Sequence, residues 1–539
     1  MTYYILLDKD KKMGNIKRQK IRLIIPVFLL VVMSMVSATL GKTIYVDADA
    51  TGANSGTNWA DAYNYLQDAL DDANLSAKPV EIRVAQGIYR PDESAVEPNG
   101  TGNREATFHL INGVTLKGGY AGPRMSLSGA DPNARNIDLY ETILSGDLNG
   151  DDIDVNGPSD LLDEPTRAEN SYHVVTGSGT DETSVLDGFI VTAGNANGQS
   201  EQHYHRGGGM LNDSGSPTIA NCTFRGNAAE EGGGMNNGWV GSPTLTNCTF
   251  NRNSADWSGG GMSNAEADPT LINCTFSGNS ARYGGGGMEN SFNSPILINC
   301  RFSGNSAIIG GGIDNFNNNL ELTNCTFVGN SANDVGGGIS IFHFSILTVT
   351  NCTFSGNRAV FGSTIYSYDI WLTLTNCILW DGWYEIWIER PLPMTITYND
   401  VQGGWPGEGN IDTDPCFAQP GYWDQNGTPD DSNDDFWVDG DYHLKSQAGR
   451  WDVNEGRWTR DEATSLCIDA GDPASPIGLE PFPNGGIINM GSFGGTAEAS
   501  KSYFGEPVCE TIVAGDINGD CIVNLIDFAL IVFHWLEEH

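Results

Sequence analysis

The sequence predicts an all-β protein built as a parallel β-helix, a solenoid of short strands, with a small calcium-binding loop near its C-terminus. Three observations lead to this fold class: a glycine-rich and charge-poor composition, an Asn-Cys pair that returns at a fixed period, and an acidic loop of EF-hand type. The 539 residues include 68 glycines, and Lys, Arg, Asp and Glu together make up only 18 % of the chain. This composition argues against a helical or coiled-coil protein.

The charge balance restricts the partners. The chain has 28 Lys and Arg against 68 Asp and Glu, which gives a formal net charge of −40. A protein that binds nucleic acid by neutralising phosphates needs a basic face. We therefore expect no nucleic-acid partner.

The internal repeat predicts the solenoid. Asn-Cys pairs recur every 25 to 27 residues, with the cysteines at Cys222, Cys248, Cys274, Cys300, Cys325, Cys352 and Cys377. Gly-Gly-Gly followed by Met or Ile recurs in the same phase and ends at Met210, Met235, Met262, Met288, Ile313 and Ile339. A unit of about 26 residues is shorter than a propeller blade, and it predicts coils that bury their apolar faces against one another.

The spacing within a repeat predicts where the chain bends. Cys222 and Phe224 share one strand face because side chains alternate, whereas Ile219 and Cys222 lie an odd number of residues apart. A bend must fall between them, and Asn221 suits it because Asn tolerates the left-handed conformation. We expect two further Asn series to form bends in the same way: Asn212, Asn237, Asn264, Asn290 and Asn315, and Asn227, Asn253, Asn279, Asn305, Asn330 and Asn357. Each coil then has three strands and three bends.

The repeated cysteines are expected to form one interior column. Disulfides or a metal are the alternatives to free thiols. In-register parallel neighbours are about 4.8 Å apart and point their Cβ atoms the same way, whereas a disulfide needs a Cβ separation of about 3.8 Å. We therefore expect buried, reduced thiols that pack as small hydrophobic side chains.

The repeat also carries a family resemblance. Gly-Gly-Gly-Met together with Asn-Cys-Thr-Phe-Ser-Gly-Asn-Ser-Ala resembles the repeats of polymorphic outer-membrane proteins and of the wider right-handed β-helix, pectin-lyase-like superfamily. The opening segment from Lys42 to Asp47 is similar to the N-terminal cap of such secreted bacterial proteins. The resemblance implies a right-handed solenoid. It does not fix the activity, because the superfamily holds lyases, hydrolases and adhesins.

The domain organisation follows from these patterns. A basic segment and the apolar run from Leu23 to Val36 are typical of a signal peptide, so we expect a secreted or cell-surface protein whose mature chain has no transmembrane span. The expected parts are a signal peptide (1–38), an N-terminal cap and first coils (42–130) with a helix over 61–73, the β-helix (131–400, with clear repeats over 207–380), a Gly/Pro/Asp-rich closing segment (401–505) and a calcium-binding repeat (506–539).

The strongest chemical motif lies near the end of the chain. Oxygen ligands fall at loop positions 1, 3, 5, 7, 9 and 12, as an EF-hand-type Ca²⁺ loop requires: Asp516, Asn518, Asp520, the Ile522 carbonyl, Asn524 and Asp527. This loop resembles one repeat of a type I dockerin, which implies a cohesin-like or other surface receptor, although dockerins normally have two repeats. Cys521 replaces the usual glycine at position 6, and we expect it to form a disulfide with Cys509 in an oxidising compartment.

A second segment begins in the same way. Asp147-Leu-Asn-Gly-Asp151-Asp152-Ile-Asp154 starts like the C-terminal loop but has Pro158 where the position-12 carboxylate is needed. Both a calcium site and a solvated acidic loop remain open for it.

Two acids and several aromatic residues form the candidate glycan site. The residue after each Met or Ile of the glycine repeat faces outward, which puts Glu289 and Asp314 side by side on successive coils. Such a pair suits a glycosidase, as proton donor and as nucleophile or base. Aromatic residues of nearby loops are candidates to stack on sugar rings: Trp239, Phe292, Phe316 and Phe342. The alternative is that these residues have no catalytic role: the two acids are exposed side chains of an acidic protein, and the aromatic rings cover the edge of the coils. We favour this alternative.

A pectate-type lyase needs a base and a cation. Arg282 and Arg358 are the obvious loop bases, but they lie about three coils apart and do not act together. The sequence thus favours a non-catalytic protein that engages polysaccharide or other cell-surface material. The alternative is a carbohydrate-active enzyme, either a polysaccharide lyase or a glycoside hydrolase.

Overall fold

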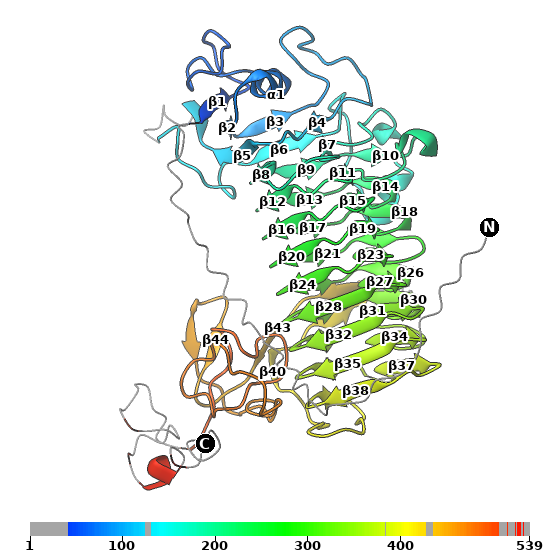
Figure 1. The fold of residues 1–539 in the computed structure, drawn as a ribbon, viewed down its shortest axis with the longest axis vertical. Helices are drawn as coiled ribbons and strands as arrows, with labels where there is room; N and C mark the ends of the chain where they lie inside the picture. The colour runs from blue at the N-terminus through cyan, green and yellow to red at the C-terminus, as the bar shows by residue number, and fades with distance from the viewer. Residues whose placement is uncertain are drawn as a thin grey trace, which may run out of the picture. The chain divides into compact units, whose positions relative to one another are not determined.

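The computed structural model describes residues 41–123, 131–382, 384–426 and 435–505, together with Gly515, Val523, Leu525–Ala529 and Val532. Residues 41–539 form one structural unit. Its main part is a stack of parallel coils, shown from the N-terminal cap to β38 in Figure 1.

Four parallel sheets run along the stack. Sheet A contains β1 (Lys42–Val46), β2 (Val80–Ala85), β5 (Val114–Tyr120), β8 (Val185–Asp187), β12 (Thr218–Ala220), β16 (Thr244–Thr246), β20 (Thr270–Ile272), β24 (Ile296–Ile298), β28 (Asn319–Thr323), β32 (Ile346–Thr350), β35 (Trp371–Thr375) and β38 (Met394–Thr397). Sheet B contains β3 (Gly87–Tyr89), β6 (Thr142–Ser145), β9 (Ile190–Thr192), β13 (Thr223–Arg225), β17 (Thr249–Asn251), β21 (Thr275–Ser277), β25 (Arg301–Ser303), β29 (Thr326–Val328), β33 (Thr353–Ser355), β36 (Ile378–Trp380) and β39 (Asp400–Val401).

The other two sheets flank the glycine triplets. Sheet C contains β4 (Phe108–His109), β7 (Val175–Thr176), β11 (Met210–Asp213), β15 (Met235–Gly238), β19 (Met262–Ala265), β23 (Met288–Ser291), β27 (Ile313–Phe316), β31 (Ile339–Phe342), β34 (Ile365–Tyr368) and β37 (Ile386–Glu389). Sheet D contains β10 (Asn195–Ala196), β14 (Ala228–Glu231), β18 (Ser254–Ser258), β22 (Ser280–Ala281), β26 (Ser306–Ile309) and β30 (Ser331–Val335).

The predicted three strands per coil are wrong, because the regular coils have four. Between β11 and β15 the chain passes through β12, β13 and β14, one strand in each of sheets A, B and D. The additional strand, β14, lies between β13, which carries the repeated Phe, and β15, which begins with the repeated Met. The glycine triplet separates β14 from β15. The close approach of neighbouring coils there explains the glycines: a Cβ on Gly234 would lie 2.5 Å from the Gly261 carbonyl oxygen.

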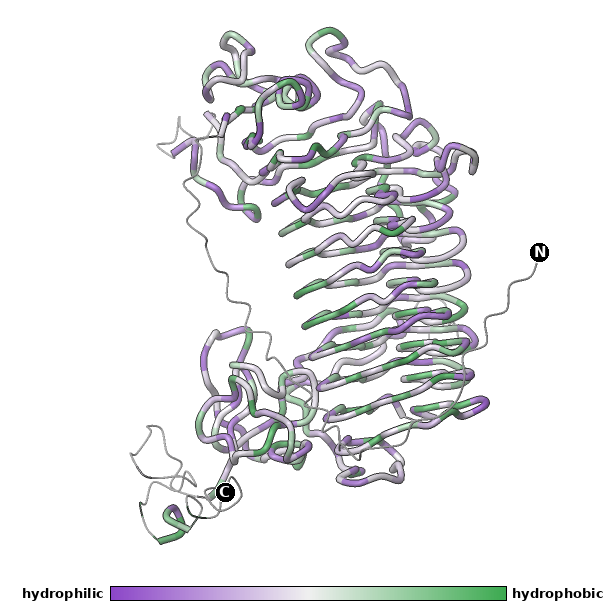
Figure 2. The backbone as a smooth tube through the Cα atoms, viewed as in Figure 1, coloured by the Kyte–Doolittle hydropathy of each residue, from purple (hydrophilic) through white to green (hydrophobic). Residues whose placement is uncertain are grey.

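The interior is built from columns of identical side chains, as the period predicts. Phe224 pairs in register with Phe250, and their rings stack with centroids 4.9 Å apart. Hydrophobic residues recur at corresponding places on successive coils in Figure 2. The seven repeated cysteines are buried free thiols, as predicted. Their Sγ atoms contact backbone carbonyls, as Cys222 does at the Ala220 oxygen, 3.2 Å away.

The asparagines play two different roles, and only one was predicted. The Asn before each repeated Cys bends in the left-handed conformation, with φ 53° at Asn221 and 54° at Asn247. The two other series do not form the bends expected of them. They are buried and hydrogen-bonded from coil to coil because an interior amide needs its donors and acceptors satisfied. One ladder runs from Asn212 to Asn290 in sheet C.

The longer ladder follows the Phe column and ends on an acid. It runs from Asn227 to Asn357, with each Nδ2 donating to the next Oδ1 at 2.8–3.0 Å. The left-handed bend lies one residue earlier, at Gly226 in the first of these coils. Asn357 donates to Asp381, and Thr364 bridges Asp381 and Glu385. Burial raises the pKa of both carboxyls, to about 7 for Asp381 and about 8 for Glu385.

The N-terminal end is covered by α1 (Leu66–Leu75), which begins later than the predicted 61–73 helix. Its apolar stripe, which includes Leu66, Ala69 and Leu70, is buried as expected. The helix contacts β1, β2 and β4. It thus covers the open edge of the first coils.

The first part of the segment expected to close the far end lies on the last coil, where Trp405 packs against the core and Ile411 pairs with Asp400. The rest of the segment packs along sheet B. Its short hairpin strands are β40 (Phe417–Gln419), β41 (Tyr422–Asp424), β42 (Phe436–Val438), β43 (Asp441–Leu444), β44 (Arg450–Asp452) and β45 (Arg457–Thr459). Val328 and Ile378, which face outward from sheet B, form an apolar cluster with Tyr442 and Met490. Arg301 in β25 forms an ion pair with Asp439. The segment therefore covers the outer face of sheet B in the later coils.

Candidate functional site

The outer face of sheet C carries two columns of side chains, because alternate residues of a strand point to opposite sides. The first column consists of Leu211, Asn236, Ser263, Glu289, Asp314, Ser340, Tyr366 and Trp387. The second consists of Asp213, Gly238, Ala265, Ser291, Phe316, Phe342, Tyr368 and Glu389. From β23 to β37 these columns are rich in acids and aromatic rings, so this part of the face is the candidate site.

Glu289 and Asp314 are neighbours, as the repeat predicts. They are register partners on β23 and β27. The Ser263 hydroxyl donates to Glu289 Oε2 at 2.9 Å, and the Ser340 hydroxyl donates to Asp314 Oδ1 at 2.6 Å. The two carboxyls are therefore held between two hydroxyls along a single column.

Gly284 lies next to the Asp314 carboxyl. It bridges Ser258 and Ile309 in neighbouring coils. A Cβ at Gly284 would lie 2.5 Å from Asp314 Oδ2, so a larger residue would displace the carboxyl from its present position. Both acids of the pair are partly buried.

Burial sets the protonation of the pair. Burial, together with the negative charge of Asp314, raises the pKa of Glu289 to about 8. Burial also raises the pKa of Asp314 to about 6, against the hydrogen bonds from Ser340 and the Asn315 backbone. At pH 7 the pair therefore holds one protonated and one ionised carboxyl.

The pair makes stability depend on pH in a defined direction. The folded protein keeps the Glu289 proton up to about pH 8, whereas the unfolded chain releases it near 4.5, so raising the pH between these values favours unfolding. We expect Glu289→Gln to melt at the same temperature as wild type at pH 4 and progressively higher as the pH rises toward 8. Thermal denaturation of both proteins from pH 4 to 9 measures this gap. Glu266→Gln, at an exposed site, is the control and should show no gap; a constant gap for Glu289→Gln would contradict the burial of its carboxyl.

Aromatic rings continue from the acid pair along the solenoid. We call Phe292, Phe316, Phe342, His343, Tyr366 and Tyr368 the aromatic row. Ring centroids in it lie 5.7 Å apart for Phe292 and Phe316, 4.9 Å for Phe316 and His343, and 5.6 Å for His343 and Tyr368. Phe342 and Tyr366 are 5.5 Å apart. The row therefore spans the four coils from β23 to β34.

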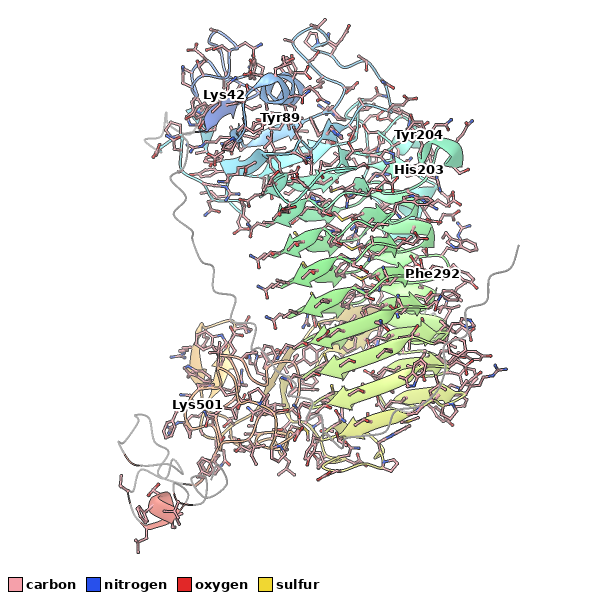
Figure 3. All side chains as sticks on the ribbon, in the orientation of Figure 1. Lys42, Tyr89, His203, Tyr204, Phe292 and Lys501 are labelled. Carbon is pink, nitrogen blue, oxygen red and sulfur yellow. The ribbon has the colours of Figure 1, made fainter. Side chains whose placement is uncertain are left out.

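Part of the row is presented to solvent. Phe292 is 55 % exposed and Phe316 40 % exposed. Phe292, labelled in Figure 3, bends the chain after β23 with φ 55°. A bulky side chain in this left-handed conformation costs about 1–2 kcal/mol, and such strain is typical of functional positions. One coil later, Asn317 takes the equivalent bend at φ 51°.

The four predicted ring residues are not all together. Phe292, Phe316 and Phe342 belong to the aromatic row. Trp239 is 53 % exposed but follows β15, two coils before Phe292. Sequence reasoning missed His343, Tyr368 and Trp387, although the spacing from Ile365 to Tyr368 matches that from Ile313 to Phe316.

The two candidate lyase bases are separated, as expected. Arg282 Nε lies 3.0 Å from Asp256 Oδ1 on the side of sheet D. Arg358 Nη1 lies 2.9 Å from Asp435 Oδ2, and its guanidinium covers the Trp423 ring at 3.5 Å. Neither arginine is among the groups that shift the pKa of Glu289. The acid pair therefore has no arginine partner suited to lyase chemistry in the described part of the chain.

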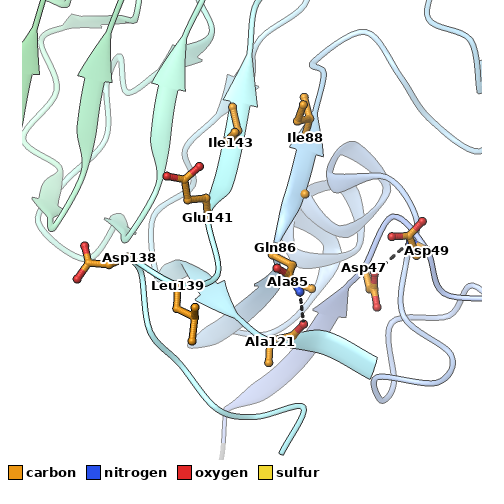
Figure 4. A pocket seen from close by; sticks show the side chains of 11 residues that line it. Asp47, Asp49, Ala85, Gln86, Ile88, Ala121, Asp138, Leu139, Glu141 and Ile143 are labelled. Atoms are coloured by element: carbon orange, nitrogen blue, oxygen red, sulfur yellow. Dashed lines mark hydrogen bonds between the residues drawn. The ribbon is translucent and has the colours of Figure 1, made fainter. Parts of the chain in front are cut away.

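A pocket of about 520 Å³ lies elsewhere, among the first coils (Figure 4). Its ionisable lining residues are all acidic: Asp47, Asp49, Asp138 and Glu141. The remaining lining is aliphatic or amide, without an aromatic ring. It therefore offers no surface for stacking and is separate from the aromatic row.

The C-terminal calcium loop falls almost entirely outside the described residues. Asp516, Asn518, Asp520, Ile522, Asn524 and both disulfide candidates, Cys509 and Cys521, are among those not described. Asp527, at loop position 12, is described and is 1 % exposed, whereas the adjacent Ile526 and Phe528 are exposed. Within the described ranges, no helix has the length and apolarity to span a membrane.

Comparisons with known proteins concern the fold. The solved structure of pectate lyase Pel9A has a TM-score of 0.43 and 15 % identity, covering 84 % of this chain and 96 % of that one. A rhamnogalacturonan lyase has a TM-score of 0.35 and 12 % identity, covering 70 % and 91 %. At these values neither likeness carries an argument about activity. No curated protein matches the sequence.

A family model matches the regular coils themselves. The family described as "Right handed beta helix region" matches residues 184–333 and 271–401. These two overlapping spans extend from β8 to β39 and include the acid pair and most of the aromatic row. Together with the parallel register of the sheets, this match assigns the right-handed parallel β-helix fold to residues 184–401, which are less than half of the chain.

Proposed function

We propose that this is a secreted protein that binds a neutral polysaccharide along the outer face of sheet C without cleaving it. The observation that carries the proposal is the aromatic row, with Phe292 and Phe316 exposed beside two half-buried acids. A contiguous exposed aromatic patch with a few placed polar groups is typical of a ligand-binding surface. The flat C–H faces of pyranose rings fit against such aromatic rings.

The stacking geometry supports a polymer as the ligand. Successive coils are about 4.8 Å apart, which is comparable to the length of one sugar unit. A chain lying parallel to the solenoid axis would place successive sugars on successive coils, using the extended surface that repeat proteins offer. The protonated Glu289 would donate a hydrogen bond to a sugar hydroxyl, and the ionised Asp314 would accept one.

Charge supports a neutral sugar over a uronate. The chain carries a net charge of −40, which repels polyanions. Among the described residues, Arg390 contacts the row: its guanidinium lies 5.0 Å from the Tyr368 ring centre and already pairs with Asp369. A polyuronate would therefore meet mostly like charge on this surface.

Affinity electrophoresis of the mature protein in gels containing neutral or acidic polysaccharides tests the proposal. We expect at least one neutral polymer, among xylan, β-glucan and galactan, to retard wild type, and Phe316→Ala to lose about tenfold in affinity. Polygalacturonate and alginate should cause no retardation. Retardation by the acidic polymers alone, or equal retardation of wild type and Phe316→Ala, would contradict the proposal.

A retaining glycoside hydrolase is the second candidate, and the protonation of the acid pair favours it. Retaining enzymes place two carboxyls about 5–5.5 Å apart, one protonated as the acid and one ionised as the nucleophile. Glu289 with a pKa of about 8 and Asp314 with a pKa of about 6 fit these roles. Release of reducing sugar by wild type, abolished by both Glu289→Gln and Asp314→Asn, would replace the binding proposal by this one.

The C-terminal loop supplies the attachment part of the proposal. Asp516, Asn518, Asp520, Ile522, Asn524 and Asp527 would hold one Ca²⁺, with a Cys509–Cys521 disulfide bracing the loop. The support is the ligand spacing in the sequence. A cohesin-like or other surface receptor would then recognise the calcium-loaded repeat.

A further inference from the structure

An acidic cluster outside sheet C gathers four carboxyls from two segments. Asp147, Asp151 and Asp152 follow β6, and Glu169 comes from the strand-free segment that leads to β7. One carboxylate oxygen from each residue lies within 4.8 Å of all the others. This is the loop whose calcium-binding role the sequence left open.

The loop is held in place by its own hydrogen bonds. Asp147 Oδ1 accepts from the backbone N–H groups of Gly150 and Asp151, at 2.6 and 3.1 Å. Asp152 Oδ2 accepts from Arg167 Nη1 at 3.0 Å and from Asn170 Nδ2 at 2.9 Å. Arg167 pairs with Asp152, and Arg90 Nε donates to the Asp147 backbone oxygen at 2.6 Å, so in the described structure four carboxyls have two guanidinium groups beside them.

Several buried oxygens in this cluster have no hydrogen-bond partner among the described residues. Asp152 Oδ1, Glu169 Oε1 and Asn170 Oδ1 are each buried and unpaired. Asn170 is 0 % exposed, and the same amide group holds Asp152 through its nitrogen, which places the unpaired oxygen beside the cluster. Buried acceptors normally have a partner, so each unpaired one requires an explanation. Three buried oxygen acceptors thus lack a hydrogen-bond donor within a cluster of four carboxyls. A bound cation would satisfy all three.

We propose that Asp147, Asp151, Asp152 and Glu169 bind one Ca²⁺, with the Asn170 side-chain oxygen as a further ligand. The donors are all oxygen, which selects a hard cation such as Ca²⁺ over zinc or copper. Carboxylates with an amide oxygen fit the six to eight oxygen ligands that Ca²⁺ takes, with water completing the shell. The cation would also balance the negative charge that Arg90 and Arg167 leave uncompensated.

Ca²⁺ at this site would hold the segment between β6 and β7, which carries the cluster, against the solenoid. Residues after the cluster extend to η1 (Pro158–Leu162), which contacts β14, β18 and β22 of sheet D. Arg252, in the bend after β17, donates to the backbone oxygens of Val155 and Asn156 at 3.1 and 2.6 Å. Arg167 Nη2 donates to the Gly194 and Gly226 oxygens. Ca²⁺ binding would therefore stabilise contacts that cross several coils.

The experiment separates this site from the C-terminal loop. In the mature protein carrying Asp516→Ala and Asp527→Ala, calorimetry with CaCl₂ should show one site with a Kd below about 1 mM, and 10 mM Ca²⁺ should raise the Tm by about 3 °C. Adding Asp151→Asn and Glu169→Gln should abolish both effects. Asp154→Asn, an exposed acid of the same loop, is the matched control and should leave both unchanged.

Two results would overturn the proposal. One is the absence of heat and Tm change in the Asp516→Ala, Asp527→Ala protein, provided its Tm without calcium equals that of wild type. The other is binding that survives Asp151→Asn with Glu169→Gln. Asp147 is left unchanged in these variants because its carboxylate also caps the loop backbone.

Discussion

Replacing Asn279 by leucine is expected to destabilise the solenoid by about 4 kcal/mol. Its amide donates to Asn305 Oδ1 and to the Phe250 oxygen at 2.9 Å each, and its Oδ1 accepts from the backbone and side chain of Asn253 at 3.0 Å. Leucine has a similar size, so the change leaves little cavity but removes four hydrogen bonds between buried groups. Two of these groups keep a second bond, because Asn305 Oδ1 still accepts from the Asn279 backbone N–H and Asn253 Nδ2 still donates to the Phe224 oxygen. At about 1 kcal/mol for each lost bond, the four bonds account for the expected loss.

Guanidinium denaturation followed by far-UV circular dichroism measures this loss. Asn273→Gly is the control, because Asn273 is exposed, lies on the neighbouring bend with φ 55° and makes its side-chain contact at the surface. It should change stability by less than about 1 kcal/mol. Equal losses for Asn279→Leu and Asn273→Gly would show that the buried ladder contributes no more than a surface contact.

Replacing Phe292 by asparagine is expected to weaken polysaccharide binding about tenfold while leaving the protein as stable or more stable. Asparagine suits the left-handed φ of 55° that phenylalanine occupies with strain. The change removes an exposed ring and its contact with Phe316, whose centroid is 5.7 Å away. Loss of one stacking surface of about 1.4 kcal/mol corresponds to the tenfold change. Affinity electrophoresis and thermal melting measure the two effects separately.

Trp239→Asn is the matched control for Phe292→Asn. Trp239 has the same kind of bend, with φ 57°, and is 53 % exposed, but it lies two coils outside the aromatic row. It should gain similar stability without loss of affinity. If Trp239→Asn weakened binding as much as Phe292→Asn, the glycan surface would extend over β15 and β19 or lie elsewhere.

The parts of the fold that could be predicted are those in which one repeat constrains the next. The columns of Cys222, Phe224 and Met210 follow from the period because parallel coils stack in register. The roles of Asn227 and Asn212 could not be assigned, since asparagine suits both a left-handed bend and a buried amide ladder. The C-terminal segment has no period, so its packing against sheet B left no signal in the spacing.

The candidate site could also be predicted only in part from the sequence. The adjacency of Glu289 and Asp314 follows from the register of one repeat. Their raised pKa values depend on burial, which spacing alone does not reveal. Tyr368 was missed because the glycine triplet is degenerate in its coil, although its column continues unbroken from Phe316.

A sugar chain on the aromatic row, parallel to the axis of the coils, would be seen in a crystal structure. The crystals would hold the mature protein with a neutral oligosaccharide of a polymer that retards it in gels. We expect sugar rings over Phe292 and Phe316, with hydroxyls hydrogen-bonded to Glu289 or Asp314. An oligosaccharide seated instead on the stacked Trp257 and Tyr283 rings of sheet D, with sheet C bare, would contradict this expectation.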